Sequence, residues 1–428
     1  MGDIIRRARA LRAEVLSGSP SAFKASQIWE NAYDSLHRKA IAEIDDELAF
    51  IDVMTANNAF TYPRLVDEPL FQPVVDRYLA YLEEQGSSLN SLPKEIEESL
   101  FVSKRSTTTA VGRPISTMFL HHLCMMLRVS SLTSDLGKVI EIGGGYGGLA
   151  RMMRLFNPRQ TYIIVDLLDS LYCSYVFISA HFPDAKILFV TKPEHAADIA
   201  GSDFVFVPTQ CFDVLKGGSA DLIVNTASFG EMVGRDVDDY MQFINHGSDT
   251  RYFYSVNRYA RFSEDVSLPD QAYASVKLSP DWEILYWDAF GTRSFHQLDP
   301  CHPPQLELLA KRIPADQSAT RTRETIAGLL ASAATHLPTG SSDWHYCMWE
   351  AARLFPSKPL LEKYIEGALP QTFRDAVYYR ELMKTASPSA PRLPAGIDLT
   401  SQDSEPLTAS TPAPAGRLGR WIAGLSKR

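Results

Sequence analysis

Residues 139–148 read V-I-E-I-G-G-G-Y-G-G and decide the fold of this chain. A mostly apolar run ends in a cluster of glycines, and residues 149–156 continue with apolar side chains at helical spacing. The pattern predicts a buried strand, a tight turn and a helix. Glycine in such a turn permits positive φ and lets a ligand approach the backbone, while the helix N-terminus offers unpaired N–H groups.

Two ligands fit the turn. Gly143, Gly145 and Gly148 satisfy G-x-G-x-x-G, which is typical of dinucleotide sites. With Glu141 added, the stretch reads acid-x-G-x-G-x-G and resembles the first motif of class I S-adenosylmethionine-dependent methyltransferases. A carboxylate would repel a pyrophosphate, so Glu141 favours the methyl donor; a turn without any ligand is the third interpretation. The turn residues expected to bind the cofactor are Glu141, Gly143, Gly145, Tyr146 and Gly147.

A second signal follows at the spacing of a βαβ unit. Residues 161–166, T-Y-I-I-V-D, form a strong strand that ends in Asp166, 21 residues beyond Gly145. This position places a carboxylate where it can accept hydrogen bonds from both ribose hydroxyls. The alternative is that Asp166 caps the next helix, which would contribute about 1 kcal/mol.

Composition limits the class of protein. The chain has 428 residues, 45% of them hydrophobic, which is enough for two or more domains. Its formal net charge of −9 argues against a general nucleic-acid binder. Five dispersed cysteines without a C-x-x-C pair indicate neither a zinc site nor a disulfide framework, so no metal is expected. Without a signal-peptide core or a long apolar run, the sequence favours a cytoplasmic protein.

The order of patterns predicts an α/β core between helical segments. Strands alternate with helices after residue 133, which implies a mostly parallel, Rossmann-like sheet. Residues 282–288 and 292–298 predict a terminal antiparallel hairpin around Gly291, whereas a dinucleotide dehydrogenase would continue with another βαβ half. The expected divisions are a helical region at 1–132, the core at 133–300, a helical region at 301–385 that includes Leu306, Leu308 and Leu309, a disordered proline-rich linker at 386–416 and a basic amphipathic tail at 417–428.

Polar residues follow several of the predicted strands. Ligands of open α/β sheets bind at the carboxyl ends of the strands, so these residues are site candidates. Gln210 is expected near the adenine edge of the cofactor, and Asn225 is expected to bind the cofactor. The candidates for contact with the substrate are Ser228, Asn257, Arg258 and Arg113. For Arg113 the alternative is a solvated basic loop.

Methyl transfer to a hydroxyl needs a group that accepts its proton. Glu231 is the first candidate, because a carboxylate in a closed site can act as a base or bind a sugar hydroxyl. The alternative is an acid that complements a helix N-terminus. His296, in the predicted hairpin, is the second candidate base.

Several motifs together are more specific than the glycine turn alone. I-E-I-G-G-G-Y-G-G, Y-I-I-V-D-L, N-T-A-S-F-G-E-M and Y-S-V-N-R resemble the bacterial sugar O-methyltransferase family over roughly residues 100 to 300. The resemblance implies a class I methyltransferase core that uses S-adenosyl-L-methionine to methylate a sugar hydroxyl on a nucleotide-sugar or surface-polysaccharide intermediate. An NAD-linked sugar-modifying enzyme and a non-catalytic Rossmann scaffold are the competing hypotheses. Glu141 and the terminal hairpin argue against the first of these.

Partners follow from the same reading. We expect the substrate to be a sugar, either a small molecule or a glycan intermediate, and we expect no nucleic-acid partner. The helical C-terminal region could serve to form a homo-oligomer. Leu418, Trp421, Ile422 and Leu425 recur at helical spacing among basic residues. The tail at 417–428 is therefore expected to contact the inner membrane surface weakly; the alternative is a disordered charged terminus.

Overall fold

The fold is seen in a computed structural model of the chain. It describes residues 3–18, 29–30, 37–56, 65–84, 86–110, 112–133, 135–232, 234–258, 278–279, 281–289, 305–313, 323–335, 344, 347–348, 351–352, 354–367 and 386–389. Within these residues, none of the helices combines the length and apolarity needed to cross a bilayer. The predicted linker lies almost entirely outside these ranges, and the tail at 417–428 lies wholly outside them.

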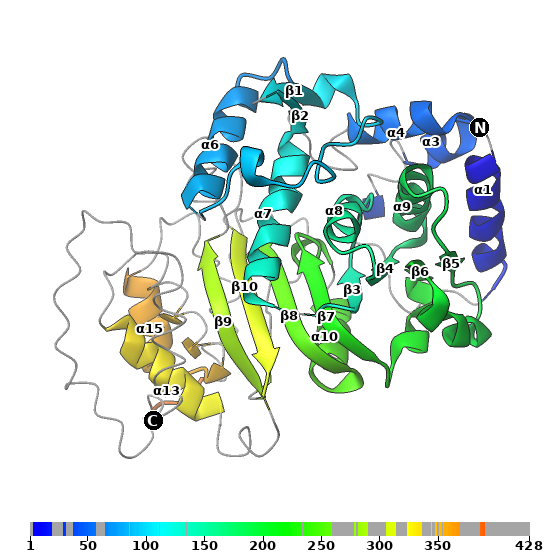
Figure 1. Cartoon of the computed structure of the whole chain (residues 1–428). Helices are drawn as coiled ribbons and strands as arrows, with labels where there is room; N and C mark the ends of the chain where they lie inside the picture. Colours follow the sequence, from blue (N-terminus) through cyan, green and yellow to red (C-terminus); the bar gives the residue numbers. More distant parts are fainter. Residues whose placement is uncertain are drawn as a thin grey trace.

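The centre of the molecule is one twisted sheet. Its order in the described chain is β5-β6-β4-β3-β7-β8-β10-β9 (Figure 1). The strands are β3 (Lys138–Ile142), β4 (Thr161–Asp166), β5 (Ile187–Phe189), β6 (Phe204–Pro208), β7 (Ser219–Thr226), β8 (Asp249–Arg258), β9 (Trp282–Ala289) and β10 (Gln305–Arg312). All pairings from β5 to β8 are parallel, and both pairings of β10 are antiparallel. The predicted Rossmann-like fold is confirmed.

The antiparallel end of the sheet corrects the sequence analysis. The strand that pairs with β9 is β10, at Gln305–Arg312, and it lies between β8 and β9. The helical assignment of Leu306, Leu308 and Leu309 is therefore wrong, and the core extends beyond residue 300. The segment at 292–298, predicted as the second hairpin strand, lies outside the described residues.

Alternating side chains of the strands bury both faces of the sheet. On β4, Tyr162 and Ile164 pack into one hydrophobic cluster, whereas Ile163 and Val165 pack into the other. This is the period of two expected for a strand covered on both sides. The first face is covered by α1 (Asp3–Leu16), α3 (Arg38–Glu43), α4 (Glu47–Thr55), α6 (Phe71–Glu84), α7 (Thr117–Leu132), α8 (Gly148–Phe156) and α9 (Leu168–His181).

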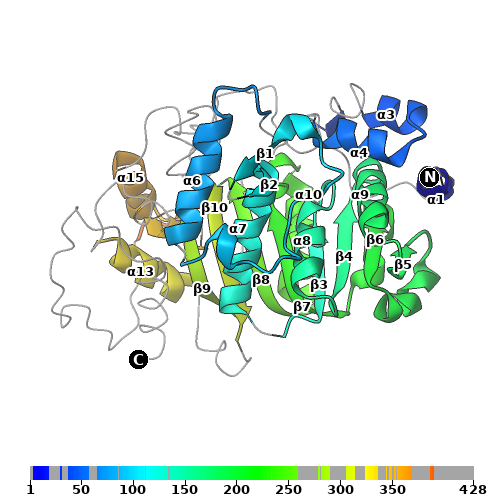
Figure 2. The same ribbon diagram turned by 45° about the horizontal axis from the view of Figure 1, so that its top comes forward.

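The second face is covered mainly by elements that follow β7, together with two 3-10 segments that precede it. These are α10 (Gly234–Gln242), the π-helical turn at Phe243–Gly247, α13 (Arg323–Ala334) and α15 (Lys358–Gly367), with the 3-10 segments η4 (Pro193–Gly201) and η5 (Thr209–Leu215) beside them. Helical segments from both ends of the chain thus flank the core, as predicted (Figures 1 and 2).

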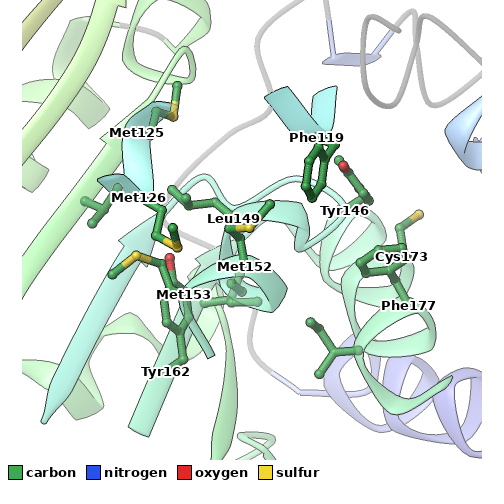
Figure 3. Packing of buried hydrophobic residues seen from close by; sticks show 14 of the residues in the cluster. Phe119, Met125, Met126, Tyr146, Leu149, Met152, Met153, Tyr162, Cys173 and Phe177 are labelled. Carbon is green, nitrogen blue, oxygen red and sulfur yellow. The ribbon is translucent and has the colours of Figure 1, made fainter. Parts of the chain in front are cut away.

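The described residues of the N-terminal region are helical or irregular, apart from one pair of strands. β1 (Thr107–Ala110) and β2 (Arg113–Ser116) form a small antiparallel hairpin directly before α7. Ser116 ends that hairpin and caps α7, because its hydroxyl accepts a hydrogen bond from the N–H of Phe119 at 3.0 Å. Helix α7 then packs Phe119 and Met126 toward α8 and α9, whereas Met125 projects from the other side of the helix (Figure 3).

Candidate functional site

The carboxyl ends of β3, β4 and β7 meet at the point where the sheet order reverses direction. Chain connections run from β3 to β4 on one side, whereas β7 lies on the other side of β3. Crevices at such switch points are where open α/β sheets bind ligands. A pocket is present there, lined by Trp29, Gly143, Gly145, Val165, Asp166, Leu167, Thr209, Ser228, Glu231, Met232, Asp236 and Tyr240. We call it the acidic pocket, for the carboxylates of Asp166, Glu231 and Asp236.

The glycine turn forms one wall of the acidic pocket. Gly143, Gly145 and Gly147 have φ of +75°, +55° and +87°, in the region that glycine alone adopts without strain. A Cβ on Gly143 would come within 2.1 Å of the Ser228 hydroxyl, whereas a Cβ on Gly145 would meet nothing within 4 Å. Gly143 therefore permits close packing of two loops, and Gly145 leaves its side of the turn open to a ligand.

Asp166 connects the end of β4 to the glycine turn. Its carboxylate accepts hydrogen bonds from the N–H of Gly145 at 2.8 Å and from the N–H of Leu167 at 2.7 Å. Burial raises the pKa of Asp166 to about 7, although these two bonds lower it, and the negative charge of Glu231 raises it further. The N-cap residue of α9 is Leu167, without a side-chain cap. Asp166 thus contacts both the glycine turn and the start of α9.

Glu231 and Asp236 complete the acidic lining from the other side. Glu231 ends the 3-10 turn η6 (Phe229–Glu231) and is 4% exposed, and Asp236 in the first turn of α10 is 5% exposed. The described lining contains no lysine, arginine or histidine. The described part of the chain also contains no group of three or more histidine, cysteine or acidic side chains that could hold a metal ion. The pocket is therefore suited to a ligand that carries positive charge.

An asparagine network holds the loop after β7 against β3. The Asn225 amide donates to the carbonyl of Ile142 at 2.8 Å and to the hydroxyl of Ser228 at 2.6 Å. Asn257 donates to the Asn225 side chain at 2.8 Å. Asn225 and Asn257 are buried and do not line the acidic pocket, and their contacts with cofactor and substrate stay predictions. They instead position Ser228, which does line the pocket.

Two residues of the glycine motif face away from the pocket. Glu141 is 1% exposed and accepts a hydrogen bond from the Tyr162 hydroxyl at 3.0 Å; burial raises its pKa to about 8. Tyr146 packs its ring against Phe177, 4.9 Å between centroids, and lies beside Phe119 of α7 (Figure 3). Neither lines the pocket. For Glu141 the reason is that alternate residues of β3 face opposite sides of the sheet. Both lie behind the turn, and their direct contact with a cofactor stays a prediction.

The other predicted site residues lie apart from the pocket or outside the described side chains. Gln210 follows the lining residue Thr209 but does not line the pocket itself. Arg113 donates to the carbonyls of Leu92 at 3.3 Å and Ile96 at 3.5 Å, so it braces a loop and is not a solvated basic residue. The side chain of Arg258 and the whole of His296 lie outside the described part of the structure.

Several lining residues were missed by the sequence analysis. Trp29 comes from the N-terminal region, and no local pattern relates it to a turn more than 100 residues away. Asp236 was missed because an acidic residue is common in the first turn of a helix, and the sequence pattern there is that of an ordinary helix N-terminus. The free space in the pocket is about 60 Å³, whereas sites for small ligands span roughly 300–1,000 Å³. Flexible or large side chains such as Met232 and Trp29 must therefore move when a nucleoside-sized ligand binds.

Comparisons with known proteins show a likeness in fold alone. No protein-family model matches the chain, and no curated protein matches it. Similar solved structures include the mitomycin 7-O-methyltransferase MmcR, with 12% identity and a TM-score of 0.31 over 46% of this chain and 55% of that one. A SAM-dependent methyltransferase from Aquifex aeolicus matches with 10% identity and a TM-score of 0.29, over 44% of this chain and 88% of that one.

The 16S rRNA methylase ArmA matches with 14% identity and a TM-score of 0.28, over 46% of this chain and 86% of that one. The chain thus spans about half of the mitomycin enzyme and most of the other two. At these identities and TM-scores the likeness carries no argument about activity. The function has to be inferred from the residues of the acidic pocket.

Proposed function

We propose that this protein is an S-adenosylmethionine-dependent O-methyltransferase that acts on a sugar hydroxyl. The observation that carries the proposal is the charge of the acidic pocket, where Asp166, Glu231 and Asp236 line the space beside the glycine turn and no described basic residue joins them. S-adenosylmethionine is a nucleoside with a ribose diol and two cationic groups, and this lining complements both features.

The hydrogen bonds of the glycine turn disfavour a dinucleotide. A pyrophosphate is held by free backbone N–H groups at the start of a helix. Here the N–H of Gly143 donates to Val165 O at 2.7 Å, that of Gly145 to Asp166 at 2.8 Å, and that of Gly147 to Gly144 O at 3.0 Å. With these donors engaged and three carboxylates nearby, an anionic ligand would be repelled. This supports the methyl donor over NAD.

The residues fit particular parts of the cofactor. Asp166 would accept hydrogen bonds from the ribose hydroxyls, Gly145 would leave room for the nucleoside, and Trp29 and Tyr240 would offer aromatic faces. Glu141 would act as a positioning residue behind the turn. When bound, S-adenosylmethionine supplies a methyl group on a positively charged sulfur, which leaves with the bonding electrons.

Glu231 is the proposed proton acceptor. As the acceptor oxygen forms its bond to the methyl carbon, its proton would pass to the Glu231 carboxylate, which is held at the pocket by the turn after Ser228. Ser228 would orient the acceptor hydroxyl. His296 and Arg258 remain candidates for the base and for substrate contact on the grounds of the sequence alone.

The choice of a sugar rests on the resemblance of four sequence motifs to sugar O-methyltransferases. With it we propose a nucleotide-sugar or glycan-intermediate acceptor, a cytoplasmic location and weak contact of residues 417–428 with an anionic membrane surface. Homo-oligomerisation through the C-terminal helical region belongs to the same proposal. Sedimentation with anionic liposomes, comparing the full chain with one truncated after Ala415, tests the membrane contact; equal sedimentation at low salt would exclude it.

Transfer of a labelled methyl group to a panel of nucleotide-sugars tests the activity. We expect a product heavier by one methylene group, and the Glu231→Gln variant should turn over about 100-fold more slowly with cofactor affinity retained. Glu194→Gln, at an exposed position of η4, is the matched control and should be fully active. Full activity of Glu231→Gln would move the base to another residue. Absence of any methylated sugar would contradict the proposed substrate class.

A further inference from the structure

The loop after β7 holds Ser228 in a strained position. Ala227, the residue before it, has φ of +59°, and the N–H of Ser228 donates to the carbonyl of Thr226 at 2.7 Å. A bond across three residues around a positive φ is the form of the γ-turn that is rare and strained. Ser228 also lies where a side chain on Gly143 would collide with its hydroxyl. Strain of this kind is concentrated at functional sites, so Ser228 is a candidate for contact with a ligand.

Backbone groups fix the orientation of the two buried amides beside Ser228. The side chain of Asn225 contacts the carbonyl of Ile142 at 2.8 Å, which can only accept, and the N–H of Phe229 at 3.3 Å, which can only donate. Its Nδ2 must therefore point to Ile142 and its Oδ1 to Phe229. Asn257 donates from Nδ2 to the carbonyl of Asn225 at 3.2 Å and to Oδ1 of Asn225 at 2.8 Å. Asn257 thus maintains the orientation of Asn225 from the neighbouring strand β8.

The Ser228 hydroxyl has its hydrogen engaged within the protein. Nδ2 of Asn225 donates to Ser228 Oγ at 2.6 Å, so the hydroxyl accepts there. Its oxygen also lies 3.2 Å from the carbonyl of Ile142, which has no hydrogen to offer, so the hydroxyl donates there. One lone pair is left, and Ser228 is half-buried at the wall of the acidic pocket. Toward a ligand, Ser228 is therefore a hydrogen-bond acceptor.

Glu231 places a second hydrogen-bond acceptor on the same side of the loop. Ser228 precedes the 3-10 turn η6 and Glu231 ends it, and the N–H of Glu231 donates to the carbonyl of Ser228 at 3.0 Å. Side chains three residues apart in a 3-10 turn lie one above the other, and both of these line the acidic pocket. A single hydroxyl has one hydrogen and cannot donate to both side chains. The pair therefore fits a ligand with two neighbouring hydrogen-bond donors.

We propose that the substrate presents a vicinal diol to this loop. One hydroxyl is methylated, and the adjacent one donates a hydrogen bond to Ser228, which orients the reacting hydroxyl through its neighbour. This inference rests on the proposed function and narrows its substrate class to a sugar hydroxyl with a free hydroxyl on the adjacent carbon. As the reacting oxygen bonds to the methyl carbon, the bond from that carbon to sulfur breaks and the sulfur keeps the electron pair. The proton of the reacting hydroxyl passes to Glu231.

The same arrangement limits the reaction to one methyl group per diol. The methylated oxygen has no hydrogen, so it cannot donate to Ser228 when the diol turns round to present its second hydroxyl. Asn257 contributes as a positioning residue. It holds Asn225, and Asn225 in turn directs the hydrogen of Ser228 away from the pocket.

Methyl transfer to matched sugars tests the inference. The panel contains nucleotide-sugars and, for each, the analogues in which one hydroxyl at a time is replaced by hydrogen. For a sugar that is methylated, we expect kcat/KM to fall at least tenfold when the adjacent hydroxyl is removed, because Ser228 then loses its partner. Removal of a remote hydroxyl should change kcat/KM little, and the product should carry one methyl group.

Three variants separate recognition of the diol from a structural role. Ser228→Ala removes the hydrogen-bond acceptor, so it should lower kcat/KM for the full sugar about tenfold and no longer distinguish it from the analogue without the adjacent hydroxyl. Asn257→Ala should reduce the same discrimination severalfold. Ser255→Ala is the matched control, because it removes a buried hydroxyl that accepts from Asn257 at 2.8 Å but leaves the bonds between Asn257 and Asn225. It should discriminate as the unchanged protein does.

Affinity for S-adenosylhomocysteine, measured by calorimetry, should be the same for the three variants and the unchanged protein. Weaker binding by Ser228→Ala would show that Ser228 accepts from the methyl donor and would overturn the proposal. Equal kcat/KM for the full sugar and the analogue without the adjacent hydroxyl would also overturn it, while leaving the proposed function intact. Methylation of no sugar in the panel would refute the proposed function and this inference together.

Discussion

Replacing Asp166 by asparagine should stabilise the free protein while it weakens cofactor binding. The wild-type carboxyl has its pKa raised from 3.8 to about 7, chiefly by burial. For an acid this means that the folded state binds the proton more tightly than the unfolded state. The free energy of unfolding therefore falls as the pH rises from about 4 to 7, and the loss is complete above pH 7. Asparagine does not ionise, so the variant should not lose stability in this pH range.

The magnitude follows from the two pKa values and the hydrogen bonds. The difference between 3.8 and about 7 corresponds to about 4 kcal/mol at full effect. Asp166 is partly exposed at the pocket wall, so solvent screening reduces this to about 2 kcal/mol. Asparagine has one acceptor oxygen for the N–H groups of Gly145 and Leu167, and losing one bond costs about 1 kcal/mol. We expect Asp166→Asn to be about 1 kcal/mol more stable at pH 8 and nearly unchanged at pH 5.

Urea unfolding at pH 5 and pH 8 measures this difference. Asp213→Asn is the matched control, because its side chain is 81% exposed and pairs only with an exposed lysine, so it should be unaffected at both pH values. S-adenosylhomocysteine should bind the wild type about tenfold more tightly at pH 8 than at pH 6, because the ribose hydroxyls need the ionised carboxylate. A variant whose stability follows the wild type at both pH values would refute the reasoning about Asp166.

Four further substitutions, at three positions, probe the loops of the acidic pocket. Gly143→Ala should lower the free energy of unfolding by about 2–5 kcal/mol, because the strain of a positive φ adds to a clash with Ser228. Gly145→Ala should lower it by only about 1–2 kcal/mol, because its Cβ would meet no neighbour. Equal losses of stability in chemical denaturation would contradict the different surroundings of the two glycines. Gly145→Val should nevertheless abolish binding of S-adenosylhomocysteine, with circular dichroism unchanged, and retained affinity would remove Gly145 from the site. Ala227 has φ of +59° in the turn after β7, so Ala227→Gly should raise the free energy of unfolding by up to about 1 kcal/mol; a loss of stability would mean that the turn is unstrained.

The sequence predicts the sheet and its turn well because those signals are local. The strand at β3, the glycines after it and Asp166 are consecutive or follow the spacing of one βαβ unit, and the structure confirms them as neighbours. β10 was missed because both of its faces are buried, which removes the alternation that marks a strand. Glu307 is buried in it beside Arg128 and accepts from Tyr254 at 2.7 Å, a pairing that only the tertiary structure creates.

The candidate site was predicted only in part for a similar reason. Residue type identified Asn225 and Glu141 as candidates for cofactor binding. The direction in which each side chain points, however, depends on which face of its strand is buried against which helix. Asn225 is used internally, and Glu141 faces Tyr162 on the opposite side of the sheet from the pocket. Trp29 reaches the pocket through the packing of the N-terminal helices, which leaves no signal in the sequence near the glycine turn.

Calorimetric titration with S-adenosylhomocysteine and with NAD tests the central claim most directly. The account predicts that the unchanged protein binds S-adenosylhomocysteine at pH 8 and does not bind NAD. It also predicts that Asp166→Ala weakens the binding by about 2–3 kcal/mol through the loss of charge-assisted hydrogen bonds. Binding of NAD, binding of neither ligand, or an unchanged dissociation constant for Asp166→Ala would contradict the assignment of the acidic pocket to the methyl donor.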